Sequence, residues 1–354
     1  MERKIIYSFQ PGPAQLFPEV EHWIQVALRD GLLSRYHRDP VWKRLFAEAQ
    51  TALADYLGLP NDWTVAFASS ATEIWQILAD AAADLSSLHF IQGEFGRRWL
   101  YFQKSLSPFA KAIEVEPHVP WEEQVDKASE KYRTVRYIGV VHVETSIGAW
   151  IPTLDRLRQA FPEAFIAIDA TSSLGGLRLP WEAIDLAFAS VQKCLGLPPG
   201  MGVLLISPKV SEYFKAMPRS RYNALGHLVQ MAQSHEPVHT PNLLLIYLLA
   251  RVLPQRLPLL QVEKELLMRA ERLYDEVKQR GFEVSMPPLY RAPTVLALKW
   301  KNPEEALTIR QRAESAGLYL GWGHGEHRDT WFRIANFPAI PDAAYDKLLE
   351  VLCS

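Results

Sequence analysis

The chain has very little cysteine and no long uninterrupted apolar run. Its 354 residues include two cysteines, Cys194 and Cys353, too few for a disulfide framework, which fits a reducing compartment. The most apolar stretch, residues 243–260, is broken by arginine and proline well short of a membrane span. The N-terminus reaches the polar Ser8 after a very short apolar stretch, unlike a signal peptide. We therefore expect a soluble, cytoplasmic protein.

An excess of charge of one sign is also lacking. The formal net charge is -2, so no broad attraction to nucleic acid or to an anionic membrane is expected, and anions must be recognised locally. No G-x-G-x-x-G or Walker-type sequence occurs, which counts against nucleotide binding. We assign no metal site. With 48% hydrophobic and 22% charged residues, the chain can bury a sizeable core.

Apolar segments with strand character alternate with helical patterns between residues 63 and 206. The expected strands are 64–68, 88–92, 111–116, 135–143, 165–170, 186–191 and 202–207. Helical patterns such as 72–85 and 153–161 lie between them. This alternation predicts an α/β fold with a mainly parallel seven-stranded sheet between helices. In such sheets, sites form at the carboxyl ends of the strands.

The pattern changes after about residue 240. A long helical region, roughly 242–280, precedes short strands near 294–300 and 331–334 and helices at 303–316 and 341–352. This pattern indicates a smaller α+β domain, and the chain length also favours two domains. We predict that residues 1–245 form an N-terminal segment and a large domain, and that residues 246–354 form a small C-terminal domain.

One lysine differs from the others in its position. Lys193 directly follows the strand at 186–191, and a Gly/Pro-rich loop leads from it into the next strand. Most of the fourteen lysines lie instead in helical patterns, where a solvated charge is expected. Burial favours the neutral amine, which is the form that attacks an aldehyde. Taken alone, the segment fits equally well a structural lysine that extends from a strand end to solvent.

A carboxylate ends the preceding strand. Asp169 lies about one helix-and-strand unit before Lys193, so the two side chains are expected at neighbouring strand ends. An isolated carboxylate buried there would be costly. In a pyridoxal site such an aspartate pairs with the pyridine nitrogen and keeps it protonated, although strand-end aspartates also occur in dinucleotide and metal sites.

A run of small residues lies between a strand and a helix at residues 66–78. Residues 69–72 would leave backbone amides and hydroxyls free at the helix N-terminus, which is a favourable position for a phosphate. The alternative is an ordinary Ser/Thr N-cap.

In their joint order these segments resemble the class V aminotransferases, which are fold-type-I pyridoxal-phosphate enzymes, over nearly the whole chain. The opening FQPGPAQLFPEV looks like the family's Pro-Gly-Pro segment. The resemblance implies that pyridoxal 5'-phosphate forms a Schiff base with Lys193. It further implies that Asp169 pairs with the pyridine nitrogen and that Gln192 lies beside the ring oxygen.

The resemblance also implies the other contacts to the cofactor. Ser70, Ala71 and Thr72 would hold its phosphate. In GEFGRRW, Phe95 falls where the family has the aromatic ring that stacks on the pyridine, although a core phenylalanine is the alternative. In HVETSIG, which looks like the family's Glu-Thr-Ser-x-Gly element, Thr145 would hydrogen-bond near the ring hydroxyl.

Two further segments resemble family elements. HTPN, at residues 239–242, resembles the stretch through which a partner subunit binds the phosphate, so His239 and Thr240 would act across a homodimer interface unless the segment is a plain loop. WFRIANFP, at residues 331–338, resembles the motif whose arginine, here Arg333, binds the substrate carboxylate as a planar bidentate donor. A surface salt bridge is the alternative for Arg333.

Two His-Arg pairs resemble the phosphoserine aminotransferase branch of this family. His37 and Arg38 resemble the pair with which the neighbouring subunit binds the substrate phosphate. His327 and Arg328 resemble a second pair shortly before the carboxylate arginine. A phosphorylated amino acid carries two anionic groups, which fits several cations in one pocket. Coincidental surface charges are the alternative.

The resemblance therefore implies an aminotransferase of serine biosynthesis that interconverts phosphoserine and 2-oxoglutarate with 3-phosphohydroxypyruvate and glutamate. Two departures leave other activities open. SSATE replaces the branch's Gly-rich phosphate segment and its arginine, and KCLGLPPGMG looks more like the serine–glyoxylate and alanine–glyoxylate relatives. A lyase or a cysteine desulfurase of the same fold is a further alternative. A desulfurase needs a mobile cysteine far from the lysine, and neither cysteine is well placed for that role.

Overall fold

The larger sheet has seven strands and confirms the expected α/β fold. The computed structural model describes residues 6–216 and 221–353. In spatial order the strands are β2 (Thr64–Ala68), β10 (Gly202–Ile206), β9 (Leu186–Ser190), β8 (Phe165–Asp169), β5 (Tyr137–Val141), β3 (Ser87–Ile91) and β4 (Lys111–Glu114). The five strands from β9 to β4 pair in parallel, whereas β10 is antiparallel to both of its neighbours. All seven strands coincide with predicted ones to within about two residues at either end.

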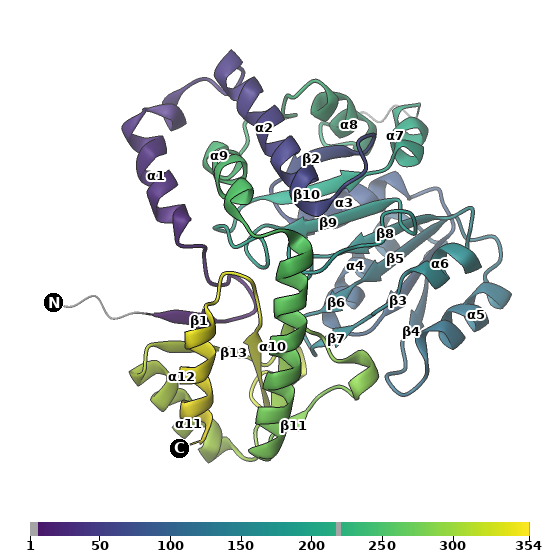
Figure 1. Ribbon diagram of the computed structural model, residues 1–354. Coiled ribbons are helices and arrows are strands. Elements are labelled where there is room, and N and C mark those ends of the chain that lie inside the picture. Colours follow the sequence, from purple (N-terminus) through teal and green to yellow (C-terminus); the bar gives the residue numbers. More distant parts are fainter. Residues whose placement is uncertain (1–5, 217–220, 354) are drawn as a thin grey trace.

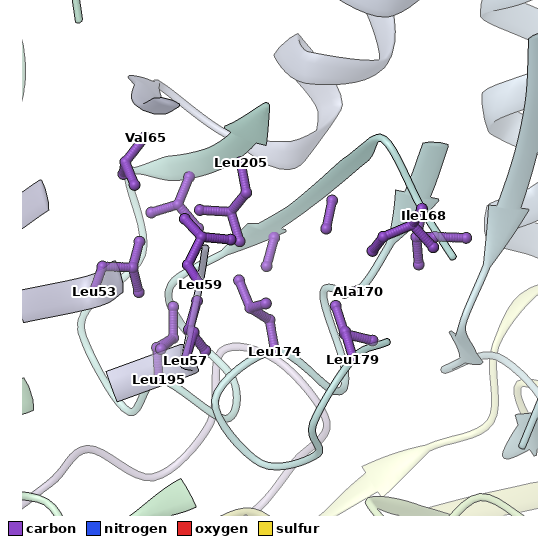
Figure 2. Close-up of a cluster of buried hydrophobic side chains, with 14 of the residues drawn as sticks. Leu53, Leu57, Leu59, Val65, Ile168, Ala170, Leu174, Leu179, Leu195 and Leu205 are labelled. Atoms are coloured by element: carbon purple, nitrogen blue, oxygen red, sulfur yellow. The ribbon is translucent and has the colours of Figure 1, made fainter. Parts of the chain in front are cut away.

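Helices cover both faces of this sheet, which explains why its strands, apart from the edge strand β4, are mainly apolar. In β9, Leu186 and Phe188 point into one hydrophobic cluster while Ala187 and Ala189 point into another. The first cluster lies under α3 (Ala71–Ala81), α4 (Glu94–Leu106), α7 (Pro208–Lys215) and α8 (Leu225–Gln233). The second lies under α2 (Pro40–Leu57), α5 (Trp121–Lys131), α6 (Asp155–Ala160) and α9 (Leu243–Val252), and Figure 2 shows part of it. Side chains of a strand alternate between its faces, so both faces must be apolar here.

A second sheet of five strands is built mainly from the C-terminal part of the chain. Its order is β1 (Tyr7–Phe9), β13 (Leu318–Trp322), β14 (Trp331–Ala335), β12 (Val295–Lys299) and β11 (Glu283–Val284). It packs with α10 (Leu259–Gln279), α11 (Pro303–Ser315) and α12 (Asp342–Cys353) around a core of its own. Strand β1, from the N-terminal segment, pairs in parallel with β13 (Figure 1). The domain boundary at residues 245/246 stays a prediction.

The remaining elements are short or peripheral. They are α1 (Glu19–Arg29), the two-stranded ladder of β6 (Val143–Glu144) and β7 (Ala149–Trp150), and four 3-10 turns: η1 (Leu32–Ser34), η2 (Leu253–Gln255), η3 (Pro288–Tyr290) and η4 (Gly325–His327).

Several helices begin where a polar side chain can bond to free backbone amides. Asp39, Ser70 and Ser207 each accept a hydrogen bond from an N–H in the first turn of α2, α3 and α7. In α2 and α7 a proline follows the cap at the first helical position, where its missing N–H has no consequence.

The helical region predicted at 242–280 is two helices rather than one. The prolines at 254 and 258 separate α9 from α10, because proline has no N–H and its ring clashes with a continuing helix. The two helices are bent by 83° at the break. No single helix of the described residues is long and apolar enough to cross a membrane, and this bent pair passes that test only when its two parts are taken together, by length and composition.

A buried asparagine fastens α10 to the second sheet. Asn336 is fully buried after β14. Its Nδ2 donates to the carbonyls of Leu266 and Pro293 at 2.9 and 2.7 Å, and its Oδ1 accepts from Nε of Arg269 at 2.6 Å. We expect Asn336→Ala to lower the free energy of unfolding by about 3 kcal/mol, because buried donors and acceptors lose their partners.

Urea unfolding followed by circular dichroism measures this loss. The control is Asn61→Ala, which removes an exposed amide and is expected to change stability by less than about 0.5 kcal/mol. Equal losses in the two variants would contradict a fastening role for Asn336.

Candidate active site

A cavity of about 250 Å³ opens at the carboxyl ends of the parallel strands and is closed on one side by the second sheet. We call it the central cavity. Its walls come from the segment before α1, the start of α3 and α4, the loops after β5, β8 and β9, and the loop between β13 and β14 with β14 itself. The residues are Pro11, Gly12, Pro13, Ala71, Thr72, Trp75, Phe95, Val141, Val143, Thr145, Asp169, Thr171, Ser190, Gln192, Lys193, His324 and Arg333.

Lys193 lies in the loop after β9 and is 7% exposed. Its Nζ donates to the hydroxyl oxygens of Thr145 and Ser172, both at 2.9 Å. Burial lowers the pKa of Lys193 to about 8, while the charge of Asp169 opposes that shift. Roughly a tenth of the amine is therefore neutral and nucleophilic at pH 7, far more than for a solvated lysine. The solvated lysine considered from the sequence is excluded.

The Pro-Gly-Pro segment packs directly on this lysine. A Cβ added to Gly12 would lie 2.9 Å from Cε of Lys193, and Gly12 has a φ of +142° that other residues rarely adopt. The backbone conformation therefore favours glycine at this position, and a larger residue would also displace the end of the Lys193 side chain.

Asp169 ends β8 on the neighbouring strand and is 3% exposed. Its Oδ1 accepts from the backbone N–H of Thr171, and its Oδ2 accepts from the indole Nε1 of Trp75, both at 2.9 Å. Burial raises the pKa of Asp169, and these bonds and the charge of Lys193 oppose the rise. An acid and an amine therefore line the same cavity, as the order of the two strands predicted.

The predicted phosphate segment is less open than expected. The N–H and hydroxyl of Ser69 both bind the Glu73 carboxylate, at 2.7 and 2.6 Å, and the Ala71 N–H binds the Ser190 hydroxyl at 2.8 Å. The Ser70 hydroxyl caps α3 by accepting from the Glu73 N–H. The expectation that residues 69–72 leave these groups free is thus wrong, because Ser190 and Glu73 bind them. Ala71 and Thr72 still line the central cavity at the positive end of α3.

Glu144 connects three parts of the site. This carboxylate is fully buried and accepts from the N–H groups of Phe95 and Gly96 at the start of α4, and from the N–H and hydroxyl of Ser146. The next residue, Thr145, binds Lys193 through its hydroxyl and accepts a bond from Nη1 of Arg333 through its carbonyl. Burial raises the pKa of Glu144, and its four donors oppose the rise.

Arg333 extends from the middle of β14 into the central cavity. Its Nε donates to the carbonyl of Trp322 at 2.7 Å and its Nη1 to the carbonyl of Thr145 at 3.0 Å. Within residues 6–216 and 221–353 no carboxylate lies within ion-pair distance of its guanidinium. Burial lowers the pKa of Arg333 to about 10, which leaves it charged at neutral pH. The surface salt bridge considered from the sequence is therefore excluded in the described part of the chain.

The aromatic wall contains one predicted residue and one that sequence reasoning missed. The centre of the Phe95 ring lies 5.3 Å from Nζ of Lys193, and the ring of His324 stacks on Phe95 at 5.1 Å with an interplanar angle of 4°. Burial lowers the pKa of His324, as do the charges of Arg333, Arg98 and Lys193, against the opposing charge of Glu94. The two histidines of GHGEH differ little in sequence context, so no signal separated His324 from His327.

The predicted His-Arg pairs do not line the central cavity. His327 stacks on the indole of Trp331 at 3.9 Å, and Arg328 is exposed. His37 lies 3.4 Å from the hydroxyl of Thr240, and Arg38 forms an ion pair with Glu236 at 3.1 Å.

His239 and Thr240 lie next to the central cavity rather than in it. They line a neighbouring cavity of about 240 Å³ together with Ser69, close to the start of α3. Nδ1 of His239 is buried and has no partner among the described residues. Gln192 does line the central cavity, and its buried Oε1 also has no partner within the described ranges.

Ser172 and Trp75 are the other residues that the sequence did not single out. Ser172 lies three residues after Asp169 in the chain, but its bond to Lys193 depends on how the loops after β8 and β9 pack. From the sequence, Trp75 looks like an ordinary core residue of an amphipathic helix. Its hydrogen bond to Asp169 joins residues 94 positions apart, so the local pattern does not reveal it.

The chain is similar to several known aminotransferases. A phosphoserine aminotransferase of Rhodococcus jostii is 29% identical over 253 residues, 68% of this chain and 65% of that protein, so the match spans just under two thirds of its length. A putative phosphoserine aminotransferase of Mycobacterium leprae is 25% identical over 94% of this chain and 90% of its own. The crystal structure of a phosphoserine aminotransferase from Cytophaga hutchinsonii superposes with a TM-score of 0.87 at 28% identity, covering 99% of both chains.

The family model described as "Aminotransferase class-V" matches residues 103–315. This match spans more than half of the chain and includes the loops that carry Thr145, Asp169 and Lys193. Family membership implies pyridoxal phosphate as the cofactor, as expected from the sequence. The chain belongs to the class V aminotransferase family.

Proposed function

We propose that this chain is a pyridoxal-phosphate-dependent aminotransferase and that its substrate pair is phosphoserine and 2-oxoglutarate. The observation that carries the proposal is the pairing of Lys193 and Asp169 in one cavity: a buried amine whose pKa is lowered to about 8, with a buried carboxylate on the neighbouring strand end. Arg333 supplies a charged guanidinium in the same cavity.

The donors and acceptors of the central cavity fit pyridoxal phosphate. When bound, this cofactor supplies an aldehyde that accepts an amine and a protonated ring that accepts electrons. Lys193 would hold the aldehyde carbon and Asp169 the ring nitrogen. Gln192, whose buried Oε1 has no partner in the described residues, would lie beside the ring oxygen. Phe95 would cover one face of the ring.

The phosphate would lie at the start of α3, near Ala71 and Thr72. The N–H groups of Ser69 and Ala71 already donate hydrogen bonds within the protein. We therefore infer that the dipole of α3, together with Ser70 and Thr72, attracts the phosphate. We also propose that the protein is a homodimer. His239 and Thr240 of the second subunit would then donate further hydrogen bonds to the cofactor phosphate.

Lys193 would act as the base. Once free, its amine would take the proton from the substrate α-carbon and return it at the C4' atom of the cofactor. The hydroxyls of Thr145 and Ser172 would orient Nζ for both transfers, since each lies 2.9 Å from it. Arg333 would bind the substrate carboxylate in a bidentate manner and so orient the α-carbon towards Lys193.

Two observations support phosphoserine as the amino donor. Similar proteins at 25–29% identity are named phosphoserine aminotransferases. The cavity also holds His324 beside Arg333, so a second anionic group of the substrate would meet a second basic side chain. We therefore propose that His324 contacts the substrate phosphate from within the subunit. His37 and Arg38 of a second subunit would also contact the substrate phosphate. His327 and Arg328 would lie outside the central cavity.

Other activities of the same fold receive less support. A serine–glyoxylate or alanine–glyoxylate aminotransferase would use the same lysine, aspartate and arginine, and substrate tests distinguish it. A cysteine desulfurase is disfavoured because Cys194 is buried, its Sγ lies 3.4 Å from the carbonyl of Ser172, and burial raises the pKa of its thiol.

Replacement of Lys193 tests the cofactor chemistry. We expect Lys193→Ala to bind pyridoxal phosphate without a covalent bond and to lose at least about a thousandfold in kcat, since it removes both the nucleophile and the base. Borohydride reduction and peptide mapping should locate the cofactor at position 193 in the unchanged protein and nowhere in the variant. Lys209→Ala, which removes an exposed lysine, is the control. Labelling at another lysine would overturn the assignment.

The acidity of Lys193 predicts how cofactor capture depends on pH. Only the neutral amine attacks the aldehyde, so the capture rate of the cofactor-free protein should rise with pH and level off above a midpoint of about 8. At pH 7 the rate should be roughly a tenth of its plateau. Stopped-flow absorbance measures it, with Nα-acetyl-lysine as the reference amine, whose rate continues to rise beyond pH 10. A midpoint near 10.5, the ordinary value, would mean that Lys193 is solvated.

A panel of amino donors tests the substrate. We expect phosphoserine to convert the bound cofactor with a kcat/KM at least about tenfold above that of serine or alanine, which lack a second anionic group. Analogues of glutamate without the side-chain carboxylate should be as poor as serine and alanine. His324→Asn should lower kcat/KM for phosphoserine more than for alanine, because it removes a contact that alanine never makes.

His327→Asn is the matched control for that variant, since its ring stacks on Trp331 away from the central cavity. A preference for alanine with glyoxylate would favour the alternative aminotransferase. Equal changes in kcat/KM for the two histidine variants would contradict the role of His324. The donor panel would still decide whether phosphoserine is the preferred amino donor.

A further inference from the structure

One buried tryptophan donates its indole N–H to a carboxylate of the central cavity. Trp75 is 3% exposed in α3, and its Nε1 donates to Oδ2 of Asp169 at 2.9 Å. Five other tryptophans, at positions 23, 42, 99, 121 and 300, have a buried Nε1 with no partner in the described residues. Trp150 and Trp181 donate to a histidine nitrogen and a backbone carbonyl, so among the described residues Trp75 is the tryptophan whose indole N–H bonds to a carboxylate.

The bond completes a two-point attachment of the carboxylate. Oδ1 of Asp169 is held by the N–H of Thr171, which belongs to the same loop, and Oδ2 is held by Trp75, which belongs to a different helix. Two donors on two oxygens fix the plane of the carboxylate. Each oxygen retains acceptor capacity, and Asp169 lines the central cavity.

The same bond counteracts the effect of burial on the charge. A buried acid is more easily protonated, and burial is the largest influence on Asp169. A protonated Asp169 would lose most of its attraction for a protonated ring nitrogen. The indole N–H can only donate, so its bond stabilises the ionised carboxylate more strongly than the neutral acid.

Packing holds the indole in this position. Its ring lies 5.9 Å from that of Phe102 and 6.5 Å from that of Phe95, and the guanidinium of Arg98 lies 5.7 Å from its centre. Rotation of the indole away from Asp169 would require these neighbours to move. The first residues of the same helix, Ala71 and Thr72, also line the central cavity.

We propose that Trp75 is a positioning residue whose indole N–H orients Asp169 and holds it ionised, so that the carboxylate pairs with the ring nitrogen of the cofactor. This inference rests on the proposed function, because it presumes that pyridoxal phosphate occupies the central cavity.

The test compares two ligands and two variants. Cofactor-free protein is titrated with pyridoxal phosphate and with its 1-deaza analogue, in which a C–H replaces the ring nitrogen, and dissociation constants are measured by equilibrium dialysis. Trp75→Phe should weaken pyridoxal phosphate binding roughly tenfold and change binding of the analogue less than about twofold, because the analogue has no nitrogen to pair with Asp169.

Trp99→Phe is the matched control. Trp99 belongs to the same hydrophobic cluster, is 1% exposed, and its Nε1 has no partner in the described residues, so its replacement should change both dissociation constants less than about twofold. If Trp75→Phe does not fold, benzothienylalanine at position 75 removes only the N–H while it keeps the ring shape.

The outcomes separate this inference from the proposed function. Equal weakening of both ligands by Trp75→Phe, or no weakening of either, would overturn the role of Trp75 while the proposed function stands. If the unchanged protein binds neither ligand, the proposed function itself fails. Selective loss of affinity for the ligand that contains nitrogen supports both.

Discussion

The burial of an amine and a carboxylate in one cavity is the constraint on which the rest of this structure depends. Lys193 and Asp169 are each less than a tenth exposed, and burial acts on both in the direction of the neutral form. Each charge partly offsets that effect on the other. Hydrogen bonds with the surrounding hydroxyls, the indole and the backbone N–H also affect which protonation state Lys193 and Asp169 adopt. A reactive amine and an ionised acid can therefore exist side by side.

The fold brings these groups together through the direction of its strands. Strands β8 and β9 run in parallel, so Asp169 and the loop that carries Lys193 meet at one edge of the sheet. The second sheet adds Arg333 from β14, and the carbonyl of Thr145 binds that guanidinium across the junction. Glu144 then joins the start of α4 to the same loop. A shift of one sheet relative to the other would thus change the positions of Lys193, Phe95 and Arg333 relative to one another.

Local patterns were sufficient to predict the larger sheet and the residues at its strand ends. Six of the seven strands are mainly apolar runs bounded by a turn or a helix, and the edge strand β4 shows instead an alternation of charged and apolar residues. Asp169, Gln192 and Lys193 lie at the ends of such runs. Helix ends were predicted less well. The backbone N–H groups and hydroxyls of residues 69–72 were expected to be free. Instead Glu73 binds the N–H and hydroxyl of Ser69, and Ser190, which is distant in the sequence, binds the N–H of Ala71. Strand β1 was not predicted, because three residues show no periodicity.

By itself the sequence determined the class of fold, the family and the identity of the amine and its acid, since these depend on order and spacing along one chain. Only the tertiary structure decided which histidine of GHGEH enters the cavity, that Ser172 binds the amine, and that Trp75 binds the acid. The physical reason is the same in each case. A hydrogen bond or a stacked ring between distant segments depends on angstrom-level packing of helices and loops, which leaves no periodic trace in either segment.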